Sequence, residues 1–233
     1  AIDAMEKKQA DKPLAANLRG RTLLAKQDLV GARKSFERAQ TIDPTYFPAV
    51  ASLAALDLVE KKPEDAKKRF EALVAKDPKN VQALLALAEL RSRTGGTKEE
   101  VGELIAKAVA ANPLEATPRV MQIDFLLRSN DVKQALSTAQ AAVAALPDSA
   151  ELLGALGRTQ QAAGDLNQAI SSFSKLVTMR PQAVQPLMRL ADAQMAAKDK
   201  NAAASSLRKA LDIKPDLLEA QRGLIMIEVD AKR

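Results

Sequence analysis

Small and apolar residues recur along the chain in sets of three, and the members of each set are spaced by four and then three residues. Side chains at these spacings share one face of an α-helix, so each set predicts a helix with one packed face. Six such sets follow one another: Ala32, Phe36 and Ala39; Ala66, Phe70 and Leu73; Val101, Ile105 and Ala108; Ala135, Ala139 and Ala142; Ala169, Phe173 and Leu176; Ala203, Leu207 and Ala210.

A proline follows each set, five residues after its last member. A proline cannot continue a helix, so each one predicts a helix end followed by a turn. The six are separated by 34, 35, 34, 34 and 34 residues: Pro44, Pro78, Pro113, Pro147, Pro181 and Pro215. The extra residue falls at Gly95-Gly96, which we expect to lie in a turn, where an insertion disturbs no packed face.

Each set is also preceded by a small or apolar residue that predicts an earlier helix packed closely on the first. These residues are Gly20, Ala54, Ala88, Ile123, Gly157 and Ala191. The chain is therefore expected to repeat a pair of helices six times. Such a period must be recognised before local structure is interpreted, because it decides the whole fold.

The pattern resembles the tetratricopeptide repeat (TPR) family, in which a 34-residue unit forms two antiparallel helices, A and B. The resemblance implies an all-α fold, a right-handed TPR superhelical solenoid of antiparallel helix pairs. Residues 1–12 would be the tail of a preceding repeat helix, and residues 218–233 a terminal or capping helix. Six repeats are expected between them: 13–46, 47–80, 81–115, 116–149, 150–183 and 184–217.

One position departs from the family pattern in every repeat. The tyrosine that the family usually carries late in helix A is replaced by Leu23, Asp57, Arg91, Leu126, Gln160 and Gln194.

The amino-acid composition excludes several kinds of catalytic and metal-binding site. Hydrophobic residues make up 47% of the chain but aromatic residues only 3%, so the apolar content is chiefly Ala and Leu, which favour helices. The sequence contains no His, Cys or Trp, which excludes Cys/His zinc sites, disulfides, thiol nucleophiles and His-based catalysis. We therefore expect no catalytic, cofactor-binding or metal-binding residues, and a protein that is not an enzyme.

The resemblance also implies a binding surface, because helix A lines the concave groove of a TPR solenoid. The family's groove positions include these residues here: Asn17, Arg21, Leu24, Glu89, Arg93, Asp124, Arg128, Arg158, Gln161, Arg189 and Arg222. We expect a non-enzymatic scaffold that binds a protein or peptide partner in this groove.

The basic residues are sorted between the helices. The net charge is +6, and the expected A helices carry nine Arg but no Lys. Arginine forms bidentate pairs with carboxylates, which favours a partner with acidic groups. The alternative is local pairing at i,i+4, as between Glu89 and Arg93 or Asp124 and Arg128. Arg21, Arg158 and Arg189 lack an acid at such a spacing and are the strongest groove candidates.

Two other functions compete with a protein-binding scaffold. An RNA-binding helical repeat is one, because base-reading repeats have a similar period and the chain is basic. Aromatic side chains for base stacking are scarce, so no nucleic acid partner is expected. The other is a TPR module of a larger enzyme. No apolar run is long enough for a transmembrane segment.

A narrower resemblance concerns residues 46–54, 78–89 and 215–224. These stretches are similar to the TPR-repeat lipoproteins of bacterial PEP-CTERM/exosortase systems. That resemblance implies a role in envelope and exopolysaccharide export assembly, and a location in the periplasm, anchored to the outer membrane by a lipid attached outside these residues.

Overall fold

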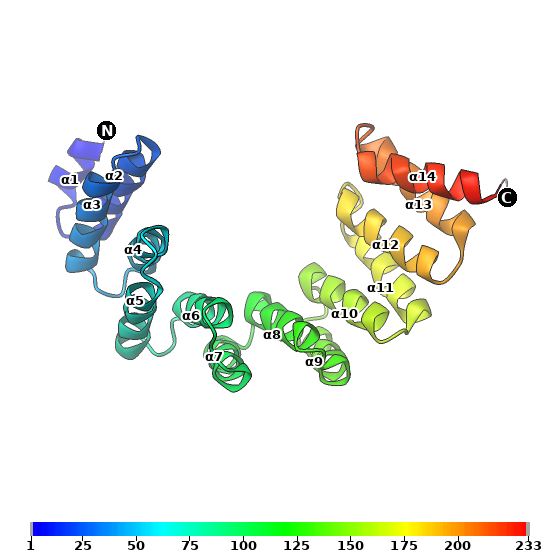
Figure 1. Cartoon of the computed structure of the whole chain (residues 1–233), viewed down its shortest axis with the longest axis horizontal. Helices are drawn as coiled ribbons and strands as arrows, with labels where there is room; N and C mark the ends of the chain where they lie inside the picture. Colours follow the sequence, from blue (N-terminus) through cyan, green and yellow to red (C-terminus); the bar gives the residue numbers. More distant parts are fainter. Residues whose placement is uncertain (1, 232–233) are drawn as a thin grey trace. The chain divides into compact units, whose positions relative to one another are not determined.

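The structure is a computed structural model that describes residues 2–231, and within this range the chain forms α-helices and no strands (Figure 1). The all-α prediction is confirmed. The contacts divide the chain into two compact units, residues 1–113 and 114–233.

The first unit stacks helices that are adjacent in the sequence. Helix α2 packs on α3, α4 on α5 and α6 on α7, while α3 contacts α4, α5 contacts α6 and α1 contacts α2. The helices are α1 (Ile2–Lys8), α2 (Pro13–Ala25), α3 (Leu29–Ile42), α4 (Phe47–Val59), α5 (Pro63–Lys76), α6 (Val81–Arg93) and α7 (Lys98–Ala111).

The second unit follows the same order. Helix α8 packs on α9, α10 on α11 and α12 on α13, and α14 covers the last pair through α13. The helices are α8 (Ala116–Arg128), α9 (Val132–Ala145), α10 (Ala150–Ala162), α11 (Leu166–Met179), α12 (Val184–Ala196), α13 (Lys200–Ile213) and α14 (Leu218–Ala231). Each expected repeat thus contains one helix pair; the repeat boundaries themselves stay a prediction.

The packed faces lie where the sequence pattern predicts them. All eighteen members of the six sets are buried on the second helices of the pairs, and so are the six residues predicted to face them from the first helices. The extra residue at Gly95-Gly96 lies in the connection between α6 and α7, as expected.

The two residues that meet between the helices of a pair are complementary in size: where one is small, the other is large. A Cβ atom added to Gly20 would lie 2.5 Å from the Phe36 ring, and one added to Gly157 would lie 2.6 Å from the Phe173 ring. In the pair α8–α9 the sizes are exchanged, since Ile123 and Ala139 share one buried cluster. The summed volume at this contact, rather than either residue alone, keeps the two helices close.

We predict that the contact between Ile123 and Ala139 tolerates an exchange of sizes. Ile123→Ala should lower the free energy of unfolding by about 2–4 kcal/mol through the cavity it leaves. Ala139→Leu should lower it by about 1–3 kcal/mol through overpacking. The double variant, which copies Ala191 and Leu207 of the last pair, should cost about 1–2 kcal/mol less than the sum. Urea denaturation of the four proteins measures this; additive costs would contradict it.

The connections inside the pairs share a backbone conformation. One residue in each has a positive φ, and the six recur at the repeat period: Gln27, Lys61, Gly95, Asn130, Gly164 and Lys198. Asp28, Asp131 and Asp199 then cap the following helices, because each side chain accepts a hydrogen bond from a backbone N–H three residues on.

A charged residue is buried between the first two pairs. Asp57 on α4 is only 2% exposed, and its carboxylate pairs with Arg69 on α5 and, at 2.8 Å, with Arg33 on α3. Arg33 also reaches Glu60 at the end of α4, at 2.8 Å. Asp57 therefore links its own helix pair and the preceding one through two guanidinium groups.

Two buried amides occupy the same repeat position as Asp57 in the second unit. Gln160 and Gln194 accept hydrogen bonds of 2.7 Å from the hydroxyls of Ser172 and Ser206. At Asp57, Gln160 and Gln194 the place of the family's tyrosine is thus taken by buried polar groups with partners inside the protein.

We predict that removing the Asp57 carboxylate destabilises the first unit. Asp57→Ala should lower the free energy of unfolding by about 3 kcal/mol, because the partly buried guanidinium of Arg69 loses its anion and that of Arg33 keeps only Glu60. Glu60→Gln is the matched control, and because Glu60 is exposed it should cost less than about 1 kcal/mol. Chemical denaturation measures both; equal effects would show that burial of Asp57 has no special consequence.

Candidate functional site

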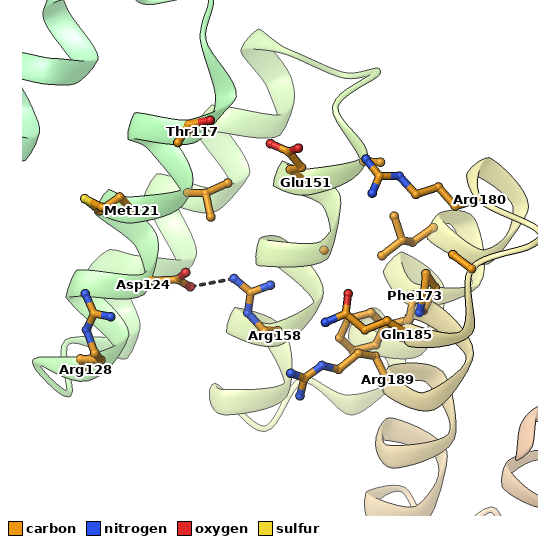
Figure 2. Close-up of a pocket in the computed structure, with 16 residues that line it drawn as sticks. Thr117, Met121, Asp124, Arg128, Glu151, Arg158, Phe173, Arg180, Gln185 and Arg189 are labelled. Atoms are coloured by element: carbon orange, nitrogen blue, oxygen red, sulfur yellow. Dashed lines mark hydrogen bonds and ion pairs between the residues drawn. The ribbon is translucent and has the colours of Figure 1, made fainter. Parts of the chain in front are cut away.

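A hollow with a volume of about 430 Å³ lies on the second unit, between α8, α10 and α12 and beside the end of α11 (Figure 2). We call it the arginine hollow. It is lined by Thr117, Val120, Met121, Asp124, Arg128, Ala150, Glu151, Gly154, Arg158, Phe173, Leu176, Arg180, Ala183, Gln185, Pro186 and Arg189.

The charged groups of the arginine hollow are mostly positive. Arg128, Arg158, Arg180 and Arg189 contribute four guanidinium groups, against the carboxylates of Asp124 and Glu151. The remaining lining residues are mainly apolar, among them the Phe173 ring from the core of the pair α10–α11. The site therefore combines cationic groups with an apolar surface.

One ion pair crosses the hollow. The Arg158 guanidinium donates to the Asp124 carboxylate at 2.7 Å, and both side chains are about one-third exposed, at 32% and 36%. Figure 2 shows Arg158 between Asp124 on α8 and Arg189 on α12. The two partners are 34 residues apart, so equivalent positions of neighbouring helix pairs face each other here.

This ion pair differs from the local alternative, in which Asp124 pairs with Arg128 one turn away on the same helix; in the structure Asp124 pairs with Arg158 instead. Arg158 has no acid at such a spacing on its own helix, as the sequence indicates, but it meets one from α8. A first helix contacts the next first helix as well as its own partner, so the sequence spacing on one helix does not decide which charges meet. In the described residues, no ion pair joins Glu89 to Arg93 either.

A smaller hollow of about 190 Å³ lies on the first unit. Glu89 and Arg93 line it from α6, and the rest of its lining is apolar: Ala51, Ala54, Ala55, Leu58, Phe70, Ala86 and Leu90. It has one carboxylate and one guanidinium, so unlike the arginine hollow it carries no excess of positive charge.

Sequence models of the tetratricopeptide repeat family match residues 23–90 and residues 155–217, which together are more than half of the chain. The chain belongs to the tetratricopeptide repeat family. As a TPR protein it has the fold of a protein–protein interaction scaffold. Among curated proteins, none matches the sequence significantly.

Solved TPR structures share the fold at low sequence identity. Yeast Tom70 is 14% identical with a TM-score of 0.70, and the match covers 99% of this chain and 50% of Tom70. The Cut9–Hcn1 hetero-tetramer of the APC/C is 16% identical with a TM-score of 0.65 over 97% of this chain and 45% of that chain. YrrB, described as a TPR protein with an unusual peptide-binding site, is 19% identical with a TM-score of 0.55 over 82% of this chain and 97% of YrrB.

The other residues expected on the TPR groove lie apart from the arginine hollow. Arg21, Leu24 and Arg222 are exposed, and Gln161 is half-buried. Asn17 is only 3% exposed, and its Oδ1 has no hydrogen-bond partner in the described residues. Helix α2 packs against α1, α3 and α4, and the place of Asn17 on the groove stays a prediction.

Several lining residues of the hollow were not expected from the sequence. Arg180 follows the end of α11, outside the first helices to which the groove positions were assigned. Phe173 was expected only in the core, and it both fills the core and lines the hollow. An Arg directly before the repeat proline Pro181 is the one signal that could have indicated Arg180.

Two searches of the described residues bear on other chemistry. No group of three or more Asp or Glu side chains in that range is arranged to hold a metal ion. None of its helices is long and apolar enough to cross a membrane.

We predict that the ion pair across the hollow contributes little to stability. Because Asp124 and Arg158 are both about one-third exposed, solvent screens the pair, and a double-mutant cycle with Asp124→Asn and Arg158→Gln should give a coupling of about 0.2–1 kcal/mol. Chemical denaturation of the four proteins measures the coupling. A coupling above about 2 kcal/mol would mean that the pair holds α8 and α10 together.

Proposed function

We propose that this TPR protein is a non-enzymatic scaffold and that its arginine hollow binds an acidic segment of a protein partner. The observation that carries this proposal is the convergence of four arginines on one hollow that offers only two carboxylates. Asp124 pairs with one nitrogen of Arg158, Nη2, and leaves the other donors of that guanidinium, while Arg128, Arg180 and Arg189 form no ion pair within the described residues. The surplus guanidinium groups are available to carboxylates from outside the chain.

The type of cation supports an anionic partner. Helices α8, α10 and α12, which line the arginine hollow, contain Arg but no Lys, and the same is true of α14. Every Lys of the second unit lies outside these four helices. A guanidinium group presents a planar set of N–H donors that matches a carboxylate, and its weak hydration suits a partly enclosed site. A merely soluble surface would be served equally well by Lys.

The comparisons support a peptide or protein partner in general terms. The structural relative YrrB is described as having a peptide-binding site, and Cut9 forms a hetero-tetramer with Hcn1. A TPR scaffold that binds a partner segment is consistent with both.

The aromatic side chains weigh against RNA. Phe36 and Phe173 are fully buried, Phe47 stacks on Phe70 with ring centroids 6.3 Å apart, and Tyr46 packs on a buried cluster. Single-stranded RNA is usually bound by bases stacked on accessible aromatic rings. We therefore place RNA second to an acidic peptide.

The cellular setting remains as the sequence resemblance predicts it. A role in bacterial envelope and exopolysaccharide assembly, with a lipid anchor outside these residues, stays a prediction. So does attachment to a larger enzyme. Both settings are compatible with a hollow that binds an acidic segment.

We predict that the arginine hollow discriminates between peptides by charge. A fluorescein-labelled glutamate-rich peptide should bind more tightly than a lysine-rich peptide of equal length, and added salt should weaken it. Arg158→Gln combined with Arg189→Gln should reduce its affinity at least about tenfold, because hydrogen bonds to charged groups are lost. Fluorescence anisotropy measures each affinity.

The matched control is Arg208→Gln on α13, an exposed arginine outside the hollow, which should leave the affinity unchanged. Equal binding of both peptides, or unchanged binding by the double variant, would refute the proposal. Tighter binding of labelled single-stranded RNA than of the acidic peptide would favour the RNA alternative instead.

A further inference from the structure

Helix α10 carries two interior glycines, and the fold accounts for only one of them. A Cβ atom at Gly157 would lie 2.6 Å from the Phe173 ring, so the packing of α10 on α11 requires glycine there. A Cβ atom at Gly154 would meet only a Leu176 methyl at 3.4 Å and an Arg158 nitrogen at 4.0 Å. The first distance is ordinary van der Waals contact, so the packing leaves room for a Cβ atom, as in alanine, at Gly154.

Glycine at position 154 therefore destabilises helix α10, and the packing of the helices does not require it. Glycine in a helix interior is less stable than alanine, since it has more conformational freedom to lose on folding. Gly154 lines the arginine hollow, and a side chain in its place would extend beside Leu176 and Arg158. The missing side chain enlarges the hollow at this point.

The residues around Gly154 indicate which kind of partner side chain would fit in the space beside it. Leu176 lies beside Gly154, and together with Phe173 and Pro186 it belongs to the buried apolar lining of the hollow. Val120, Met121 and Ala150 supply partly exposed apolar surface, and Arg158 and Arg189 also line the hollow. Figure 2 shows Phe173 behind Gln185 and Arg189, on the α11–α12 side of Arg158. The volume of about 430 Å³ lies within the range of about 300–1,000 Å³ typical of ligand sites, enough for a large side chain and its neighbours.

We propose that Gly154 opens a socket for one apolar side chain of the partner, and that this side chain lies between acidic residues that pair with Arg158 and Arg189. The proposal deepens the proposed function and rests on it. The arginines supply attraction to acidic segments in general, and the socket at Gly154 selects among them. The ligand class is an acidic peptide interrupted by a single large apolar residue.

Two labelled peptides test the socket: one with a central Leu between two glutamates on each side, and one with a central Gly in the same frame. The wild type should bind the Leu peptide about tenfold more tightly, as expected for burial of one Leu side chain. Gly154→Leu should fill the socket, so that the Leu peptide binds no better than the Gly peptide.

Gly154→Ala keeps the test decisive if the larger substitution impairs folding. This variant should melt at or above the wild-type temperature, because Ala favours the helix and its Cβ makes only ordinary van der Waals contact, and its preference for the Leu peptide should fall to an intermediate value. Ser174→Leu on α11 is the matched control: it adds the same side chain at an exposed position outside the hollow and should retain the full preference.

The possible results distinguish failure of the socket proposal from failure of the proposed function. Failure of both peptides to bind, or equal binding by the Arg158→Gln/Arg189→Gln variant, refutes the acidic-segment site and the socket with it. Arginine-dependent binding without a preference for Leu overturns the socket alone, and so does a full Leu preference that persists in both Gly154 variants.

Discussion

The contact of one small residue with one large residue inside each helix pair sets the distance on which the rest of the structure depends. Gly157 admits the Phe173 ring to within van der Waals contact of the α10 backbone. The same ring also lines the arginine hollow. The packing of the pair thus places part of the lining of the hollow, so a change in this contact would also displace an apolar wall of the hollow.

Much of the fold follows from the sequence, because the repeat presents the same information six times. A single set such as Ala32, Phe36 and Ala39 is weak evidence for a buried face, but six sets in one register leave little choice of helix orientation. The site follows only in part. Local spacing predicts charge pairs one helical turn apart, whereas Asp124 meets Arg158 on a neighbouring helix of the stack.

Other features escaped prediction for equally physical reasons. The burial of Asn17 depends on the helices that cover α2, and nothing in its own repeat specifies them. Arg180 reaches the hollow from a connection, where the helical period gives no direction for a side chain. Sequence periodicity predicts which residues share a helix face, but the stacking of successive helices decides what that face meets.

The two units use arginine differently. In the first, Arg33 and Arg69 form ion pairs with the buried Asp57, so both guanidinium groups make contacts within the stack of helices. In the second, the equivalent buried positions are amides hydrogen-bonded to serines, and the arginines of the hollow remain at the surface. At Gln160 and Gln194 the core of the second unit therefore needs no arginine to neutralise a buried charge.

The turn residues with positive φ have a consequence for the folding order. Left-handed backbone is unfavourable for most residues with a side chain, so the turns at Gln27, Lys61 and Lys198 need compensation from helix packing, whereas Asn130 adopts this conformation more readily. Gly95 and Gly164 meet no such barrier, and each unit contains one of them. We expect the hairpins α6–α7 and α10–α11 to act as the folding nuclei of their units, which the folding rates of variants in each hairpin would reveal. The glycine hairpin of the second unit would then be the one that carries Arg158 and Phe173, so part of the lining of the arginine hollow would be among the first structures to form.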